Sequence, residues 1–174
     1  MQSFEIRTIE TTSGDTKKQL EQVQRKLGFV PTFLGTFASA PVALNAYLNI
    51  ENQWERSSFS PEEQNIVLLA SSVENNCPYC TAVYATALRK LRISEDVISS
   101  IISKKKLEDK KWNVLVHVTK DMVESRGFAA KPIIQHFIDA GYTQQHLIEL
   151  LIGVAVGNMS NYLEHMIQMP MEKA

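Results

Sequence analysis

The chain has 174 residues and a formal net charge of −1, with 44% hydrophobic and 21% charged residues. This composition is that of a globular domain with a core of ordinary size, and it excludes a disordered or collagen-like chain. The near-zero net charge removes the general electrostatic argument for a nucleic-acid partner or an anionic membrane surface. The chain contains only two cysteines, which excludes a fold held by a disulfide framework.

Apolar residues recur at helical spacing along the chain, and glycine is scarce. Eight or nine helices are predicted, in chain order at about 15–27, 32–38, 41–54, 61–73, 78–91, 94–102, 107–126, 132–140 and 143–169. Their start and stop signals are specific. Gly28 stops the first helix, Ser60 and Glu63 form a capping box for the fourth, and Thr143 caps the last. We therefore expect an all-α bundle with short loops, forming one domain over 1–174.

No segment reads as a membrane span or a signal peptide. The longest apolar stretch, 147–156, contains Glu149 and falls short of the roughly 20 residues that a bilayer requires. We expect a soluble protein of the cytoplasm with no membrane partner. The lysines at 104–106 have no interleaved aromatic residues, so they predict a solvated helix junction and no nucleic-acid partner.

The two cysteines occur in one motif, Cys77-Pro78-Tyr79-Cys80, at the predicted start of a helix. The free N–H groups and the dipole of a first helical turn stabilise a thiolate, and a second cysteine one turn away can close a disulfide with it. A redox pair is the interpretation that we prefer. The alternative is a chance pair of buried structural cysteines.

A metal centre is not expected from the sequence. A zinc site would need two ligands besides the two cysteines. No further cysteine is present, and the histidines at 117, 136, 146 and 165 show no paired metal spacing. We therefore predict neither a metal nor a cofactor.

Three motifs together resemble one family. They are Gly28-Phe29-Val30-Pro31, Ser60-Pro61-Glu62-Glu63 and Cys77-Pro78-Tyr79-Cys80. They are similar to the carboxymuconolactone decarboxylase superfamily, in its alkylhydroperoxidase D-like (AhpD-like), peroxidase-related branch. This resemblance implies an all-helical fold, a homo-oligomer (trimer or hexamer), reduction of a peroxide or disulfide substrate by the CxxC pair, and an external thiol reductant. It also implies that Cys80 attacks the substrate and Cys77 resolves the product.

Two positions depart from the family's motif. The family has a glutamate twelve residues before the first cysteine, where this chain has Asn65, and a histidine four residues after the second, where it has Tyr84. Asn65 can orient a water but cannot exchange a proton, and Tyr84 is a poor base at neutral pH that can still donate a hydrogen bond. We therefore expect weak peroxidase activity. Thiol–disulfide exchange needs only an accessible thiolate and a resolving partner.

The free N–H groups at the start of the helix favour Cys77 as the exposed thiolate, whereas the family resemblance favours Cys80. The sequence therefore leaves the order of attack open. Glu62, Glu74 and His165 are candidates to replace the missing base. Glu62 lies one turn before Asn65, while Glu74 reads more simply as a solvated residue at a helix end. His165 ends a polar stripe with Asn158 and Asn161 and reads more simply as a surface histidine.

The function predicted from the sequence is that of a thiol-dependent oxidoreductase. Two alternatives remain open. One is an oligomeric redox sensor or binding protein of the same fold without turnover. The other is a decarboxylase-like lyase, against which the intact cysteine pair argues.

Overall fold

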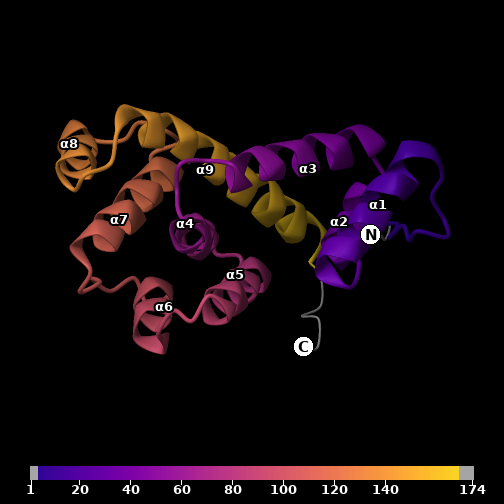
Figure 1. Ribbon diagram of the computed structural model, residues 1–174, viewed down its shortest axis with the longest axis horizontal. Coiled ribbons are helices and arrows are strands. Elements are labelled where there is room, and N and C mark those ends of the chain that lie inside the picture. The colour runs from indigo at the N-terminus through magenta and orange to yellow at the C-terminus, as the bar shows by residue number, and fades with distance from the viewer. Residues whose placement is uncertain (1–3, 169–174) are drawn as a thin grey trace.

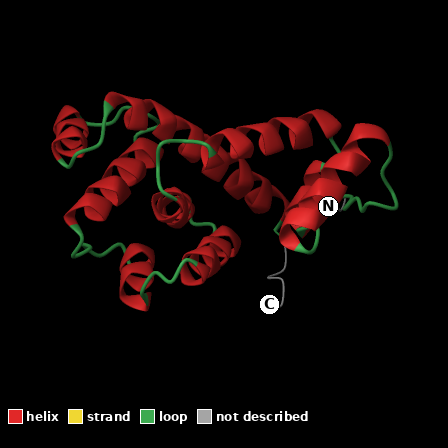
Figure 2. Ribbon diagram, in the orientation of Figure 1, coloured by secondary structure: helices red, strands yellow, loops and turns green. Residues whose placement is uncertain are grey.

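The computed structural model describes residues 4–168, and within that range it contains helices and no strands. Figure 2 shows the same composition, with helices joined by short loops. The helices are α1 (Gly14–Leu27), α2 (Thr32–Phe37), α3 (Pro41–Glu55), α4 (Pro61–Glu74), α5 (Pro78–Lys90), α6 (Glu95–Ile102), α7 (Lys110–Glu124), α8 (Lys131–Asp139) and α9 (Gln144–Ile167). The all-α prediction is confirmed. None of the described helices combines the length and apolar character needed to cross a bilayer.

The largest difference from the predicted helix boundaries is at the start of α7. α7 begins at Lys110 and not at 107, because the Asp109 carboxylate accepts the Trp112 N–H and caps the helix there. The Leu107 N–H instead donates to the Asn113 side chain, which holds 107–109 outside the helix. At the other end, α9 is described as far as Ile167, and the predicted last helical residue, Met169, lies outside the described residues.

The centre of the molecule is α4. Figure 1 looks nearly along its axis and shows α5, α6, α7 and α9 arranged around it. Most of its side chains after the first turn are buried, including Ile66, Val67 and Leu69, because it has neighbours on every side. The predicted capping box is present at its start: the Glu63 N–H donates to the Ser60 hydroxyl, and the Ser60 N–H donates to the Glu63 carboxylate.

The long helix α9 crosses α3 and α4 at two glycines. A Cβ on Gly153 would lie 2.7 Å from the Trp54 ring of α3, and a Cβ on Gly157 would lie 3.0 Å from the Ser71 Cβ of α4. The Trp54 ring is buried, and few neighbouring atoms can move to make room for it. These glycines therefore set how closely α9 approaches the centre of the bundle.

We predict that Gly153→Ala lowers the free energy of unfolding by about 2 kcal/mol, because the overpacking cost exceeds the helix propensity gained. Gly157→Ala is the matched control on the same helix. Its new Cβ would lie 3.0 Å from the Ser71 Cβ, a milder overlap than the 2.7 Å at Gly153, so the gain in helix propensity of about 1 kcal/mol should offset a larger part of its cost. Urea unfolding followed by circular dichroism measures both. Equal stability of the two variants would contradict this account of the α3–α9 contact.

Candidate active site

The two cysteines lie at the start of α5. Cys77 is the N-cap residue of this helix, and its sulfur accepts a hydrogen bond from the Cys80 N–H over 3.3 Å. Pro78 occupies the first helical turn, where its missing N–H costs nothing. Asn76 turns the chain between α4 and α5 with a φ of 55°, a left-handed conformation that asparagine tolerates. Both thiols are free, with exposed fractions of 1% for Cys77 and 5% for Cys80.

A network of amides holds the end of α4 against α9. The Asn75 side chain donates to the side-chain oxygens of Asn158 and Asn161, at 2.7 and 2.9 Å. Asn161 in turn donates to the Ser72 hydroxyl over 3.2 Å. Asn161 and Ser72 are fully buried, so these bonds are shielded from water. The loop that carries Cys77 is thereby fixed relative to the last two turns of α9.

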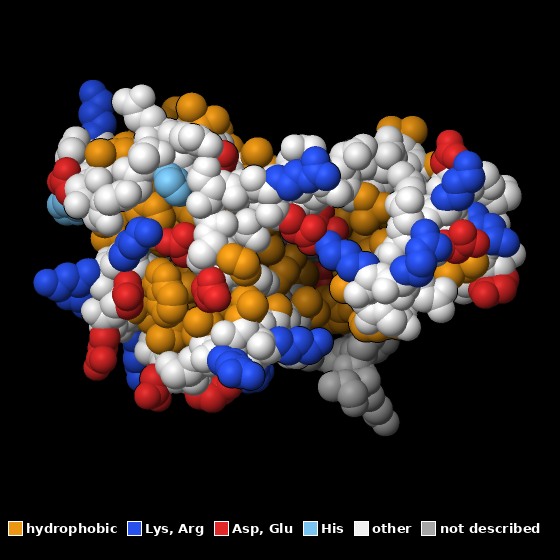
Figure 3. Space-filling model, viewed as in Figure 1, with side chains coloured by type: hydrophobic (Ala, Val, Ile, Leu, Met, Phe, Trp, Pro, Cys, Tyr) orange, Lys and Arg blue, Asp and Glu red, His pale blue; other side chains and the backbone are white. Residues whose placement is uncertain are grey.

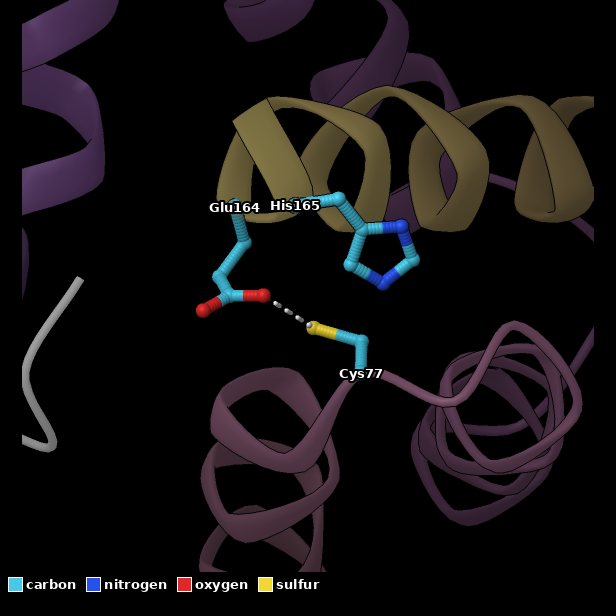
Figure 4. A group of neighbouring side chains, drawn as sticks. All are labelled: Cys77, Glu164 and His165. Carbon is cyan, nitrogen blue, oxygen red and sulfur yellow. Dashed lines mark hydrogen bonds between the residues drawn. The ribbon is translucent and has the colours of Figure 1, made fainter. Parts of the chain in front are cut away.

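The last turns of α9 present Glu164 to the first cysteine. The Cys77 thiol donates to Oε2 of Glu164 over 3.6 Å, as drawn in Figure 4. Glu164 is 9% exposed and forms no ion pair with a basic residue in the described part of the chain. Glu164 was not predicted from the sequence, because 87 positions separate it from Cys77. The one indication near it in the sequence is the polar stripe formed by Asn158, Asn161 and His165.

His165 lies beside this pair. One ring nitrogen of His165, one carboxylate oxygen of Glu164 and the Cys77 sulfur all lie within 4.8 Å of one another. Figure 4 shows both α9 side chains directed toward the start of α5. His165 is exposed, so it is at once a surface histidine and a neighbour of the cysteine within the same subunit. Sulfur, carboxylate and imidazole are zinc donors, and these three can hold a metal ion if a fourth ligand completes the set.

The two thiols have opposite acidities. The hydrogen bond with Cys77 lowers the pKa of Cys80 despite burial, with help from the polar groups of Asn161 and Ser160 on α9. The same contact with Cys80, together with burial, raises the pKa of Cys77. Cys80 is therefore the thiol that ionises first, and Cys77 keeps its proton.

The two substituted family positions have different surroundings. Burial, the neighbouring Cys80 and Glu51 raise the pKa of Tyr84, so its phenol stays protonated near neutral pH. Asn65 donates its amide to the Pro61 carbonyl on its own helix over 2.8 Å. Among the described residues, Asn65 forms no hydrogen bond with either cysteine or with Tyr84.

Two of the candidate replacement bases do not reach the cysteines. The Glu74 carboxylate pairs with Lys104 over 3.1 Å and with Lys120 over 4.0 Å. Successive helical residues point about 100° apart, so Glu74 faces the lysines of α7 and the loop after α6, whereas Asn75 faces α9. Glu62 is half-buried in the first turn of α4 and bonds to no other described side chain.

Aromatic side chains cover the cysteine pair. Tyr79, Phe33 and Tyr84 pack against the two sulfur-bearing residues. Behind them, the Tyr47 ring meets Phe33 edge-on at 5.6 Å between centroids, and its buried hydroxyl has no hydrogen-bond partner within the described residues. Burial and the neighbouring Glu55 raise the pKa of Glu51, on the same helix as Tyr47, to about 7. Figure 3 shows hydrophobic side chains gathered in the middle of the face on which α5 and α9 lie.

The fold matches solved structures of peroxidase-related proteins. An AhpD-core, uncharacterized peroxidase-related protein from Ralstonia eutropha JMP134 superposes with a TM-score of 0.85 at 17% identity, covering 97% of this chain and 90% of that one. A peroxidase-related protein from Silicibacter sp. TM1040 gives 0.78 at 21% identity, covering 90% and 84%. The AhpD-like fold that the resemblance implies is thus confirmed.

A debrominase has the same fold. The apo form of Bmp8 superposes with a TM-score of 0.83 at 12% identity, covering 99% of this chain and 94% of that one. A cysteine-to-alanine variant of Bmp8, in complex with 2,3,4-tribromopyrrole, gives 0.82. No protein-family model and no curated protein matches the sequence.

We predict that limited iodoacetamide alkylates Cys80 of the reduced protein before Cys77, because the Cys80 pKa is the lowered one. The Cys80 rate should reach half its maximum below the pH of about 8.5 that is typical of a free thiol. Cys77→Ser removes the principal cause of the shift and should move that midpoint upward. Peptide mass spectrometry across a pH series measures both. Preferential labelling of Cys77 would contradict the assignment.

Proposed function

We propose that this chain is a thiol-dependent oxidoreductase that cycles Cys77 and Cys80 between dithiol and disulfide. The observation that supports it is the pair of free, neighbouring thiols at the start of α5 with opposite pKa shifts. A structural pair has no need of one acidic and one protonated sulfur. A two-step exchange needs both, because one thiolate attacks the substrate first and the other thiol reacts with the mixed disulfide only in the second step.

Disulfides are the substrates whose reduction asks least of the groups in this site, and because only 5% of Cys80 is exposed a small disulfide suits it better than a bulky one. The Cys80 thiolate attacks one sulfur of the substrate, the substrate's S–S bond breaks, and the first thiol leaves with the electron pair and takes up a proton. Cys77 then loses its proton and attacks the Cys80 sulfur, which releases the second thiol and closes the internal disulfide. The substrate gains two electrons, the pair loses two, and an external thiol returns them.

A hydroperoxide can follow the same route more slowly. Attack by Cys80 breaks the O–O bond, an alcohol leaves with a proton, and Cys80 becomes a sulfenic acid. Cys77 then displaces water to give the same disulfide. The first step needs a proton donor for the leaving alkoxide. Tyr84 keeps its proton and is a weak acid here, and Asn65 cannot supply one, so we expect peroxide turnover to be poor.

The cycle suits the cytoplasm, where an external thiol pool keeps cysteines reduced. A homo-oligomer, trimer or hexamer, is part of the proposal. It is supported by the exposed apolar side chains that α9 carries, which are Ile148, Leu151, Tyr162 and Met166.

We predict that an oxidised small disulfide removes both free thiols of the reduced wild type, whereas an equal concentration of hydroperoxide does so at least about tenfold more slowly. Free-thiol titration before and after each oxidant measures the loss. Cys77→Ser should stop at a mixed disulfide on Cys80, and Cys80→Ser should not react at the first step. An unchanged thiol count with both oxidants would overturn the proposal. Oxidation without turnover in the presence of excess thiol would identify a redox sensor instead.

Reductive dehalogenation is a second candidate. It is favoured by the aromatic cover over the cysteines, which can stack on a flat halogenated ring, and by the similarity of the fold to that of Bmp8. In this reaction a carbon–bromine bond breaks and the carbon takes up a proton. Bromide leaves with the other proton, and the dithiol becomes the disulfide.

If the second candidate holds, the reduced wild type should release one bromide from a brominated pyrrole for each pair of thiols it loses. Ion chromatography and thiol titration on the same sample give this ratio. Cys80→Ser is the control and should release none. Absence of bromide from the wild type would reject debromination, while the disulfide-exchange proposal would stand on its own test.

A further inference from the structure

We propose that Glu164 is a catalytic residue that accepts the Cys77 proton when the internal disulfide closes, and that His165 passes this proton to solvent. This inference rests on the proposed function and names a part of its second step. It gives Glu164 a chemical role that was not predicted from the sequence, and it gives His165, already a candidate base, a defined step.

The partners of Glu164 differ from those of Glu63 and Glu74, two other glutamates whose side chains are buried. Glu63 is paired with Lys111 and accepts the Tyr142 hydroxyl, and Glu74 is paired with two lysines. Glu164 is comparably buried, yet its hydrogen bond is to a thiol. A buried carboxylate that serves the fold is normally compensated by a cation or by several donors. Glu164 has no such compensation among the described residues, and its bonded partner is a reactive group of the proposed cycle.

The position of Glu164 is fixed by its helix. Asn161 precedes it by three residues, so the two side chains lie on the same face of α9. The bonds from Asn161 to Ser72 and Asn75 hold that face against the end of α4, which leads directly into Cys77. The carboxylate and the thiol are therefore held together by the same contacts that hold α4 to α9, and little reorganisation is needed before proton transfer.

The resolving step needs a proton acceptor at this place. Cys77 must become a thiolate to attack the sulfur of Cys80, yet contact with Cys80 and burial keep its pKa high. As the S–S bond forms, the proton moves from the Cys77 sulfur to Oε2 of Glu164 along the existing hydrogen bond. The His165 ring lies within 4.8 Å of both groups and is exposed, so it can relay the proton from the carboxylate to water.

The two chemical steps can be timed separately with an aromatic disulfide such as 5,5′-dithiobis(2-nitrobenzoate). Attack by Cys80 releases the first coloured thiolate, and closure of the internal disulfide by Cys77 releases the second. For Glu164→Gln, which keeps the shape and loses the base, we expect the second release to slow by about 100-fold while the first stays within about twofold of the wild type. His165→Ala should slow the second release by less. Glu164→Asp should recover part of the rate.

Glu149→Gln is the matched control, because Glu149 lies on the same helix and bonds Ser58 and Gln145 far along the chain from the thiols. It should leave both releases unchanged. An unaltered second release in Glu164→Gln would overturn the inference, as would equal slowing of both releases, which indicates a purely structural role. If the wild type gives no release, the proposed function fails instead.

The same assay separates proton transfer from metal binding by these three donors. A chelator should leave both releases of the wild type unchanged, since the proposal needs no metal. If a chelator changes the wild-type rates and abolishes the difference between wild type and Glu164→Gln, these side chains act as metal ligands and the proton-acceptor role is rejected.

Discussion

The close approach of α9 to α4 is the constraint on which the site depends. Gly157 lets the α9 backbone lie against the Ser71 side chain of α4, and the bonds that link Asn161 to Asn75 and Ser72 fix the register of the two helices. The contact between the Cys77 thiol and Glu164 joins the start of α5 to the last turn of α9, a few residues beyond these bonds. A shift of one residue in α9 would rotate its side chains by about 100° and remove Glu164 from the Cys77 sulfur.

Asymmetry between the two thiols is the chemical result of this arrangement. Both cysteines are buried and close together, and the one proton of the Cys77 thiol can be directed either to the Cys80 sulfur or to the Glu164 carboxylate, while Cys80 also lies near polar groups of α9. A shared proton can stabilise only one thiolate at a time, so Cys80 gains acidity at the expense of Cys77. The lowered pKa favours Cys80 as the attacking thiolate, whereas the position at the start of the helix alone would favour Cys77. The start of the helix does contact Cys77, because the Cys80 N–H donates a hydrogen bond to the Cys77 sulfur at the N-cap.

In this AhpD-like fold, the carboxylate and the imidazole beside the first cysteine come from α9, and not from the helices that carry the family's motif. On α4 and α5, the positions at which the family has an acid and a base hold Asn65 and Tyr84. The first is bonded to its own helix, and the second stays a protonated phenol. On α9, a carboxylate and an imidazole lie beside the first cysteine. Solved structures of this fold include both peroxidase-related proteins and a debrominase, which fits a scaffold whose chemistry is set by the few groups around a cysteine pair.

The sequence by itself determined the helices and the cysteine pair. Helical spacing and capping signals are local, so Ser60 with Glu63, Gly28 and Thr143 predicted helix ends from neighbouring residues alone. The sequence could not determine which carboxylate lies next to the thiols, because that depends on contacts between residues far apart in the chain. Glu74, three residues from Cys77, turns toward lysines, while Glu164, 87 residues away, meets the sulfur. Only the packing of α9 on α4 placed Glu164 beside the sulfur. The helical turn at the end of α4 directs Glu74 toward the lysines, whereas the next residue, Asn75, faces α9.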